Sequence, residues 1–423
     1  MTSKTPIKEK STIYDVCIIG AGPGGSSTAY YLAKQGKNVI LLEKEKFPRR
    51  KICGDAVSQR AQMHLERMGV LQEILEEKKG RWAAVGGLVS PRRIEYIGNS
   101  AEEIGSHLMI SIKREILDEK IAQAAVREGA EMIEEYNVKS VKFSEKMKEW
   151  TVKAFDEEKG DVKAKVLVAA DGAVSKIARS VGVIDTPPDA VCSSVYVEAG
   201  THAFEEDGVC IYTRFLVPGY AAIFKEADDD LVFCCYIIPG GFAKTTNLQN
   251  MHINLLQGDP YVVRALGPNA KIEKIKSAPL RLGGVKKSYS DHFLVVGDAA
   301  GHIDPLTGEG IQYAMDAGEI AADILKDAFE QGDFGNGTLK NYQKLWMKSF
   351  GKDFKWSARM VKVLARIPIF LDAFAYLCKK KGPKYLIRWA KIMTGSQPKL
   401  TFFLPNLAFP LLFAAIRLSL KQK

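Results

Sequence analysis

One glycine-rich loop constrains the fold of this chain more than any other feature. Gly20, Gly22 and Gly25 form the pattern G-x-G-x-x-G, directly after an apolar stretch at 14–20 and directly before a helical stretch at 26–35. In such a unit the first glycine permits a tight turn, the second lets a pyrophosphate approach the backbone, and the third lets helix and strand pack closely. The free N–H groups at the start of the helix favour the same anion. We therefore predict that the N-terminal part of the chain binds a dinucleotide.

Two charged residues fit the same site. The apolar stretch at 38–43 completes a βαβ unit of about 30 residues and ends in Glu43, where a carboxylate can bind a ribose diol. Arg114 opens a predicted helix at 113–128, and its side chain is expected to reach the pyrophosphate.

Later segments extend the predicted site to a second ring system. Asp171 and Gly172 follow one apolar stretch, and Asp298 follows another. Asp298 is expected to accept hydrogen bonds from ribityl hydroxyls. Gly310 and Ile311 begin a predicted helix whose N–H groups and dipole would hold the pyrimidine oxygen of a flavin. Because these segments occur in the order of a stretched dinucleotide, we predict FAD as the cofactor.

The order of the motifs resembles a known flavoprotein group. G-x-G-x-x-G, R-x-x-L-D, D-G and G-D-A-A-G-x-x-x-P-x-x-G-E-G-I follow one another, as in the group that contains the aromatic hydroxylases and the geranylgeranyl reductases. Residues 48–55, P-R-R-K-I-C-G-D, are similar to the P-R-x-K-x-C-G motif of the geranylgeranyl reductase family. Residues 218–224, P-G-Y-A-A-I-F, are similar to its substrate-lobe motif P-G-G-Y-x-W-x-F-P. Ala222 stands where the family often has Trp, and Lys225 where it has Pro, which bears on the shape of the alkene pocket.

The resemblance implies a set of FAD contacts. They are Gly25, Glu43, Cys53, Gly54, Ala56, Arg114, Val138, Asp298, Gly310 and Ile311. It places Cys53 close to the flavin ring, and Tyr220 is expected to face the flavin from the second lobe, so both are candidate catalytic residues. Arg49, Arg50 and Lys51 are expected to lower the pKa of the Cys53 thiol. A buried cysteine without chemistry is the alternative, and no metal site is predicted.

We expect an α/β protein with a Rossmann-like FAD-binding domain, an inserted antiparallel β-sheet substrate lobe and a helical C-terminal extension. The substrate lobe is predicted where short β-rich stretches, divided by turns, replace helical periods. The expected segments are 1–90, 110–185 and 280–345 for the FAD-binding domain, 91–109 and 186–279 for the substrate lobe, and 346–423 for the C-terminal region.

The net charge of +10 is concentrated in the C-terminal region. Residues 351–423 hold fifteen Lys or Arg against two Asp, a charge of +13, so the preceding residues sum to −3. Lys399 precedes an uncharged run at 400–416, which is shorter than the about 20 residues of a membrane span. Cations beside apolar surface suit an anionic leaflet. We expect peripheral contact with an anionic membrane surface, with packing of this region on the core as the alternative.

Other compositional features bear on partners and compartment. The seven cysteines include no Cys-x-x-Cys, and residues 1–12 are too polar for an export signal, so we expect a cytoplasmic protein, peripheral at the inner face of the membrane. No recognition motif or aromatic platform predicts nucleic acid as a partner.

The resemblance implies a reductase that saturates carbon–carbon double bonds of an isoprenoid chain, with hydride from N5 of reduced FAD and a prenyl lipid as substrate. NADPH or a ferredoxin-like carrier would be the transient reductant, since no second glycine fingerprint is present for NADPH. The alternative enzyme is an FAD-dependent monooxygenase of a lipophilic or aromatic substrate. A flavin-bearing lipid-binding protein without turnover is a third hypothesis, and the sequence leaves the oligomeric state open.

Overall fold

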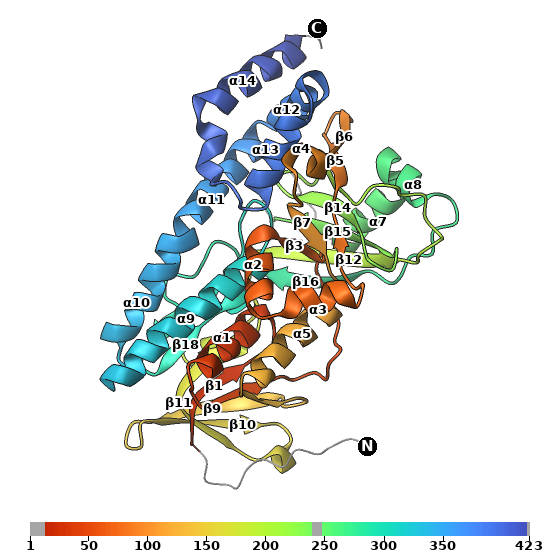
Figure 1. Cartoon of the computed structure of the whole chain (residues 1–423). Coiled ribbons are helices and arrows are strands. Elements are labelled where there is room, and N and C mark those ends of the chain that lie inside the picture. The colour runs from red at the N-terminus through yellow and green to blue at the C-terminus, as the bar shows by residue number, and fades with distance from the viewer. Residues whose placement is uncertain (1–12, 239–247, 421–423) are drawn as a thin grey trace.

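The computed structural model describes residues 13–238 and 248–420 (Figure 1). In this part of the chain the strands form an eight-stranded, a seven-stranded and a three-stranded sheet. The eight-stranded sheet lies at the end of the molecule that holds β9 and β10, and the C-terminal helices extend from it along one side to the opposite end (Figure 1).

The centre of the eight-stranded sheet is parallel, as the dinucleotide motif predicts. The order is β17-β18-β11-β1-β2-β8, and β10 pairs with both β11 and β9. β1 lies between two parallel neighbours, and its last four residues are buried, which explains its continuous apolar run. The strands are β1 (Ile13–Ile19), β2 (Val39–Leu42), β8 (Glu131–Ile133), β9 (Val138–Ser144), β10 (Glu149–Ala154), β11 (Val162–Ala169), β17 (Tyr289–Ser290) and β18 (Phe293–Val295).

Three helices cover one face of this sheet. α1 (Pro23–Lys34) packs against both α5 (Arg114–Arg127) and α9 (Ile311–Gln331), and their apolar faces share one buried cluster with β1 and β2. A Cβ at Gly318 of α9 would lie 3.0 Å from the carbonyl oxygen of Gly24, so glycine permits this close contact. The packing directs the N-termini of α1 and α9 toward the same cavity.

The seven-stranded sheet has the order β16-β12-β15-β14-β13-β5-β6 and is antiparallel except between β13 and β5. α7 (Leu248–Gly258) and α8 (Pro260–Leu266) contribute to a buried cluster on one of its faces. The strands are β5 (Val85–Val89), β6 (Glu95–Asn99), β12 (Ala190–Val197), β13 (Gly208–Ile211), β14 (Tyr220–Lys225), β15 (Leu231–Ile237) and β16 (Lys276–Leu280).

The expected division at residue 90 falls inside this sheet. β5 and β6 pair with each other, so 85–89 belongs with the strands of the second sheet rather than with the first. The sequence does not predict β5, because Gly86 and Gly87 lie within it and glycine is depleted in strands. Here they allow close backbone contact, since a Cβ at Gly87 would lie 2.0 Å from the Tyr96 carbonyl oxygen.

Shorter elements connect the two large sheets. β3, β7 and β4 form the three-stranded sheet, in that order. The elements are β3 (Ala56–Ser58), α2 (Gln59–Arg67), α3 (Val70–Glu76), β4 (Arg81–Trp82), α4 (Ser100–Ile104), β7 (Met109–Ser111) and α6 (Lys176–Ser180).

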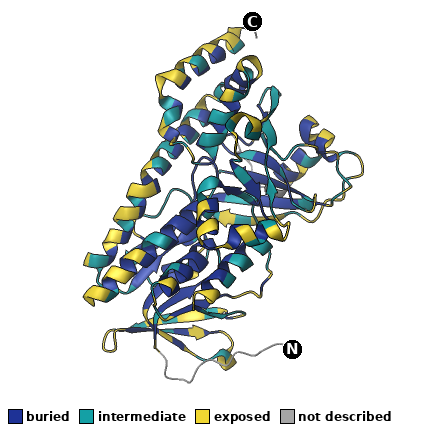
Figure 2. Ribbon diagram, viewed as in Figure 1, coloured by how far each residue is buried: buried dark blue, intermediate teal, exposed yellow. Residues whose placement is uncertain are grey.

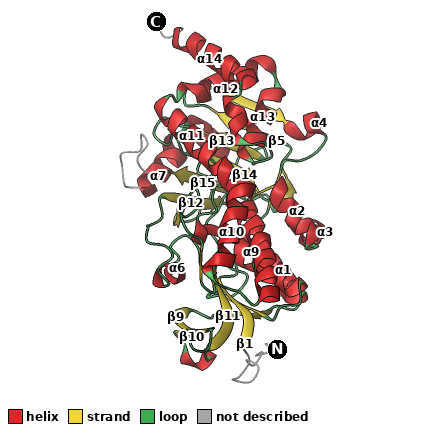
Figure 3. Cartoon of the chain, turned by 90° about the vertical axis from the view of Figure 1, so that its left-hand side faces the viewer, coloured by secondary structure: helices red, strands yellow, loops and turns green. Residues whose placement is uncertain are grey.

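The C-terminal region is helical and packs on the seven-stranded sheet (Figure 3). Its helices share a buried cluster with Leu88, Tyr212 and Val217. The helical path begins at α10, before the expected boundary at 346, and runs through a π turn into α11. The elements are α10 (Asn336–Trp346), the π turn (Met347–Gly351), α11 (Lys352–Arg366), α12 (Ile369–Lys381), α13 (Pro383–Met393), a 3-10 turn (Lys399–Phe403) and α14 (Pro405–Leu420).

α14 buries one side and exposes the other (Figure 2). Leu407, Leu411 and Ala414 are buried, whereas Phe409 and Phe413 are 57% and 69% exposed. At about 1.5 Å per residue, its 16 residues extend about 24 Å, less than the about 30 Å of a bilayer core. Within 13–238 and 248–420, every helix is too short or too polar to cross a membrane.

Candidate active site

One cavity of about 1100 Å³ brings together nearly all the predicted site residues. Its walls come from the glycine loop, the segment after β2, one face of the seven-stranded sheet, the loop before α9, and α13. The predicted residues that line it are Gly20, Gly22, Glu43, Cys53, Gly54, Ala56, Arg114, Val138, Tyr220, Asp298, Gly310 and Ile311. Gly25 lies behind the loop, where it is buried against Gly20.

The three glycines of the G-x-G-x-x-G motif differ in what surrounds them. A Cβ at Gly25 would lie 1.9 Å from the Gly20 carbonyl oxygen, and one at Gly20 would lie 2.4 Å from that of Ala170. These two glycines therefore permit close packing. A Cβ at Gly22 would meet no protein atom within 4 Å, and no side chain caps the start of α1. The loop thus offers an open cradle with free backbone donors at a helix N-terminus, which suits a pyrophosphate.

Glu43 lies where β2 ends, and backbone groups fix its carboxylate. Its Oε2 atom accepts hydrogen bonds from the Ala21 N–H and from Arg49, both at 3.0 Å, and its Oε1 atom accepts from the Glu45 N–H at 3.1 Å. A carboxylate offers about four acceptor positions, so one remains for a ribose hydroxyl. The ribose contact stays a prediction that this geometry permits.

Arg114 lines the cavity but is engaged in a buried ion pair. Its Nε and Nη2 atoms each donate to a carboxylate oxygen of Asp118 at 2.7 Å, and Arg49 donates to the same carboxylate at 2.9 Å. Burial alone would raise the pKa of Asp118, but the positive charges of Arg114 and Arg49 lower it below its ordinary value. The bidentate pair fixes the guanidinium plane at the cavity wall.

The expectation for the Cys53 thiol is wrong. Burial raises the pKa of Cys53, and the nearby Arg114 only partly opposes this effect. The cation that opposes burial is Arg114 rather than Arg49, Arg50 or Lys51, and each of those three is paired with a carboxylate. The partners are Glu43 and Asp118 for Arg49, Glu273 for Arg50, and Asp298, at 3.4 Å, for Lys51. Cys53 still lines the cavity, as a neutral thiol.

Tyr220 lines the cavity from β14 and binds the loop before α9. Its hydroxyl donates to the Thr307 carbonyl oxygen at 2.6 Å, and the hydroxyl of Tyr236, on β15, donates to that of Pro305 at 2.8 Å. Burial raises the pKa of both phenols well above the ordinary value. Two strands of the second sheet therefore hold the loop on which a flavin ring is expected. The sequence did not indicate Tyr236, which carries no motif signal.

The start of α9 offers donors to the cavity. Gly310 is its N-cap residue, and no side-chain hydrogen bond caps this end. Ile311 follows as the first helical residue. Asp298 lies beside this end of the helix, since a Cβ at Gly310 would be 3.4 Å from its Oδ1 atom, and it is paired with Lys51. An uncapped N-terminus of a long helix favours partial negative charge, as on the pyrimidine end of a reduced flavin.

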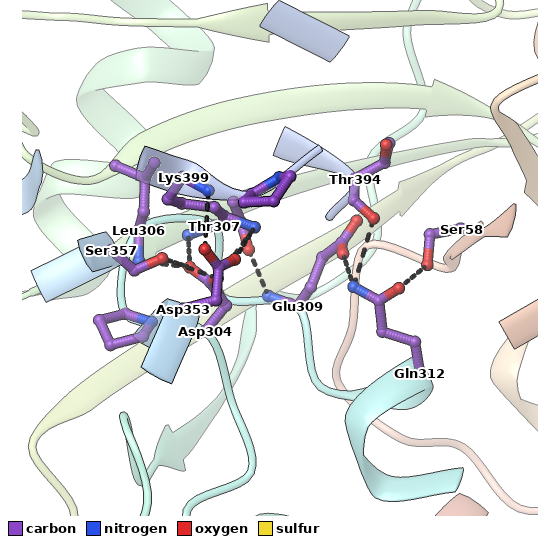
Figure 4. Close-up of polar contacts among 12 residues, drawn as sticks. Ser58, Asp304, Leu306, Thr307, Glu309, Gln312, Asp353, Ser357, Thr394 and Lys399 are labelled. Carbon is purple, nitrogen blue, oxygen red and sulfur yellow. Dashed lines mark hydrogen bonds and ion pairs between the residues drawn. The ribbon is translucent and has the colours of Figure 1, made fainter. Parts of the chain in front are cut away.

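The C-terminal region contributes parts of the site that the sequence did not reveal. Leu386, Trp389 and Met393 of α13 line the cavity. Lys399, which we expected among the cations facing a membrane, is 0% exposed, and its Nζ atom lies 3.0 Å from Asp304 in the loop before α9 (Figure 4). A cation beside a long apolar run carries no spacing signal that would identify this buried pair.

These features fit FAD in an extended conformation. Gly22 leaves open space beside free donors, Glu43 is oriented at the end of β2, and the uncapped start of α9 borders the same cavity. They would hold the pyrophosphate, the ribose and the flavin pyrimidine respectively.

The comparisons with known proteins agree with this geometry. A family model described as FAD binding domain matches residues 13–345. "Conditioned medium factor receptor 1" of Dictyostelium discoideum is 47% identical over 94% of this chain and 80% of its own length. "Digeranylgeranylglycerophospholipid reductase" of Methanosarcina acetivorans is 30% identical over 82% of this chain and 83% of its own length.

Solved structures share the fold. A geranylgeranyl bacteriochlorophyll reductase-like protein from Thermoplasma acidophilum matches with a TM-score of 0.76 and 20% identity, over 92% of this chain and 98% of its own. The flavin-dependent brominase Bmp2 matches with a TM-score of 0.71 and 20% identity, over 97% and 100%. The fold and the cavity thus define a mixed α/β flavoprotein. The chain belongs to the geranylgeranyl reductase family of FAD-dependent oxidoreductases.

Proposed function

We propose that this protein is an FAD-dependent reductase that saturates carbon–carbon double bonds of an isoprenoid chain. One observation carries the proposal: the cavity that borders the glycine loop is also lined by the apolar side chains of Phe224, Leu386, Trp389 and Met393. A prenyl chain between the seven-stranded sheet and α13 would bury apolar surface beside the expected flavin ring. The name of the 30% identical relative supports the same substrate class.

In such a reaction the residues of the protein position the flavin ring and the prenyl chain, and they supply a proton to the alkene. Reduced FAD, when bound, supplies a hydride equivalent to one alkene carbon. An isolated alkene has no carbonyl group to stabilise the resulting negative charge, so a proton must reach the other carbon at nearly the same time. The loop held by Tyr220 and Tyr236 would fix the ring, and the α13 wall would exclude water. Cys53 would contact the flavin as a neutral thiol.

A mass measurement tests the proposal directly. The holoprotein is reduced without oxygen and offered prenyl diphosphates, prenylated glycerolipids and polyprenyl quinones. Each saturated bond adds the mass of two hydrogens, and the flavin absorbance returns as the substrate is consumed. A reduced enzyme that leaves every prenyl substrate unchanged would refute the function.

The electron donor is proposed separately. NADPH or a reduced ferredoxin-like protein would bleach the bound flavin, and we propose that either acts transiently. Stopped-flow mixing of each donor with the oxidised holoprotein decides between them, because only the physiological donor bleaches it within the turnover time.

Two alternatives are favoured by specific comparisons. A monooxygenase acting on a lipophilic substrate fits a fold shared with a flavin-dependent brominase, and it would consume oxygen when substrate is added. A lipid-binding flavoprotein without turnover fits the receptor name of the 47% identical relative. That protein would bleach with a reductant and bind prenyl lipid, but neither prenyl lipid nor lipid-dependent oxygen uptake would reoxidise it.

We also propose that the protein docks peripherally on anionic membranes through α14. Five apolar side chains recur along its outer side at helical spacing, and they are Phe409, Leu412, Phe413, Ile416 and Leu420, each at least 44% exposed. Arg417 of α14 is exposed, and so are the three lysines 379–381 at the end of α12. Apolar side chains flanked by cations suit an interfacial helix on an anionic leaflet.

A further inference from the structure

We propose that Glu309 is the acid that protonates the alkene. This role rests on the proposed reductase function and concerns the glutamate of the G-E-G-I motif, to which the sequence analysis gave no role. Glu309 lies in the loop before α9 and lines the cavity together with Tyr220, Trp389 and Gly310. It directly precedes Gly310, the N-cap of α9, and it bonds to Gln312, which also bonds to Thr394 at the C-terminal end of α13.

The hydrogen bonds around Glu309 fix where its proton lies (Figure 4). Gln312 donates from Nε2 to Glu309 Oε2 at 2.6 Å and to the Thr394 carbonyl oxygen at 3.3 Å, while its Oε1 atom accepts from Ser58 at 2.7 Å. The Thr394 carbonyl can only accept, so a reversed amide would place two acceptor oxygens against each other there. Glu309 Oε2 is therefore an acceptor, and a neutral Glu309 carries its proton on Oε1.

The second oxygen is free to serve a substrate. Within the described residues, Glu309 Oε1 has no hydrogen-bond partner. It is not one of the fully buried atoms without a partner, so part of its surface is exposed. Glu309 also lies close enough to the cavity residues Cys210 and Tyr220 to raise the pKa of each, after the larger effect of burial. The O–H group at Oε1 is thus available to the cavity rather than to the protein.

Burial keeps Glu309 protonated at neutral pH. Burial raises its pKa to about 8, the positive charge of Lys399 opposes this, and the negative charge of Asp304 adds to it. Lys399 does not form an ion pair with Glu309, because it is paired with Asp304 at 3.0 Å and Asp353 at 3.7 Å. The other titratable groups facing it are the neutral Cys210, Tyr220 and Tyr313. A pKa near the working pH suits a general acid.

Other acids near the cavity are less suited. The Tyr220 hydroxyl already donates its proton to the Thr307 carbonyl oxygen. Burial lowers the pKa of His302 to about 3, and its Nδ1 atom accepts the Gly297 N–H, so His302 is neutral and turned to the backbone. Burial raises the pKa of Cys53, which makes its thiol a weaker acid.

The step balances in atoms and electrons. The Oε1–H bond of Glu309 breaks, and its proton forms a C–H bond at one alkene carbon. The other carbon takes the hydride equivalent of the reduced cofactor, so the alkene is reduced and the cofactor oxidised. Glu309 keeps the electron pair as a carboxylate and recovers a proton from water.

The test compares the holoprotein with Glu309→Gln, whose amide oxygen can still accept the bond from Gln312. We expect bound flavin and its bleaching by reductant to be unchanged and alkene reduction to fall by about 100-fold or more. The wild-type rate should fall as pH rises through about 8, because Glu309 must be protonated to act as the acid. This decrease with pH should be absent from Glu309→Gln and present in Tyr220→Phe. Glu330→Gln makes the same substitution at an exposed position at the far end of α9 and should leave the rate unchanged.

A second readout does not depend on turnover. Infrared difference spectra of the oxidised holoprotein at neutral pH should show the carbonyl stretch of a protonated carboxylic acid that Glu309→Gln lacks. A carboxylate band from Glu309 at neutral pH, or a Glu309→Gln variant that reduces alkenes at the wild-type rate, would overturn the proposal. A wild type that reduces no prenyl substrate would instead refute the reductase function, and the acid role with it.

Discussion

Substitutions in the glycine loop should affect cofactor binding and folding at different positions. Gly22 has φ −77° and ψ 179°, an extended conformation that any residue adopts, and a Cβ there would meet no protein atom within 4 Å. Gly22→Val should therefore fold normally. Its side chain would fill the space through which a pyrophosphate reaches the N–H groups of α1. Losing two hydrogen bonds to a charged group costs about 3–6 kcal/mol, or about 100-fold or more in FAD affinity.

Gly25→Ala is the matched control and should behave in the opposite way. Its Cβ would lie 1.9 Å from the Gly20 carbonyl oxygen, well inside normal contact, so α1 must move away from β1. Overpacking of this kind costs typically about 1–3 kcal/mol and occasionally more. We expect a lower free energy of unfolding for this variant even when FAD is in excess.

The assay is flavin content after purification, titration of the apoprotein with FAD, and urea denaturation of each apoprotein followed by tryptophan fluorescence. Gly22→Val should be colourless with wild-type apoprotein stability, and Gly25→Ala should be destabilised. A yellow Gly22→Val variant with wild-type affinity would refute the assignment of the cradle. A Gly25→Ala variant as stable as the wild type would refute the packing argument.

Three further predictions concern single side chains. Cys53→Ser should retain FAD and most of its alkene reduction, because Glu309 rather than the neutral thiol supplies the proton; a loss as large as that in Glu309→Gln would assign the proton to Cys53 instead. Lys399→Met should lower the free energy of unfolding by about 3–5 kcal/mol in urea denaturation, because it leaves the buried Asp304 carboxylate unpaired; a loss below about 1 kcal/mol would contradict this. Phe409→Ser with Phe413→Ser should weaken binding to anionic liposomes without changing flavin content, and unchanged sedimentation with liposomes would contradict the docking proposal.

The nucleotide motifs could be predicted because their physical causes are local. The spacing of Gly20, Gly22 and Gly25 reports a strand, a turn and a helix start that are consecutive in the chain, and the structure contains β1 and α1 at these positions. The position of Glu43 at the end of β2 could be predicted for the same reason, because it depends only on the length of one βαβ unit.

The remaining parts depend on contacts between distant segments. The Cys53 prediction failed because a sequence shows that Arg49, Arg50 and Lys51 are near in the chain but not that the thiol is buried, which raises its pKa. The α13 wall and the Lys399–Asp304 pair join residues far apart in the chain, and no spacing rule connects them. Glu309 stood inside a motif, but its protonation follows from burial, which the sequence does not display.

The buried pair between Lys399 and Asp304 also changes how the C-terminal region should be tested. A buried ion pair is weak evidence for stability, but breaking it leaves an uncompensated charge. Removal of residues 399–423 would eliminate the exposed face of α14 and, at the same time, leave Asp304 unpaired in the loop that carries Glu309. Such a truncation should lose membrane binding and disturb the flavin site together, so its result could not be assigned to either. Substitutions on the outer side of α14 separate the two, because Phe409 and Phe413 are exposed and outside the cavity wall. If these substitutions also reduced flavin content, α14 would have to act on the site through its packing, and the proposed division between a docking face and a cavity wall would be wrong.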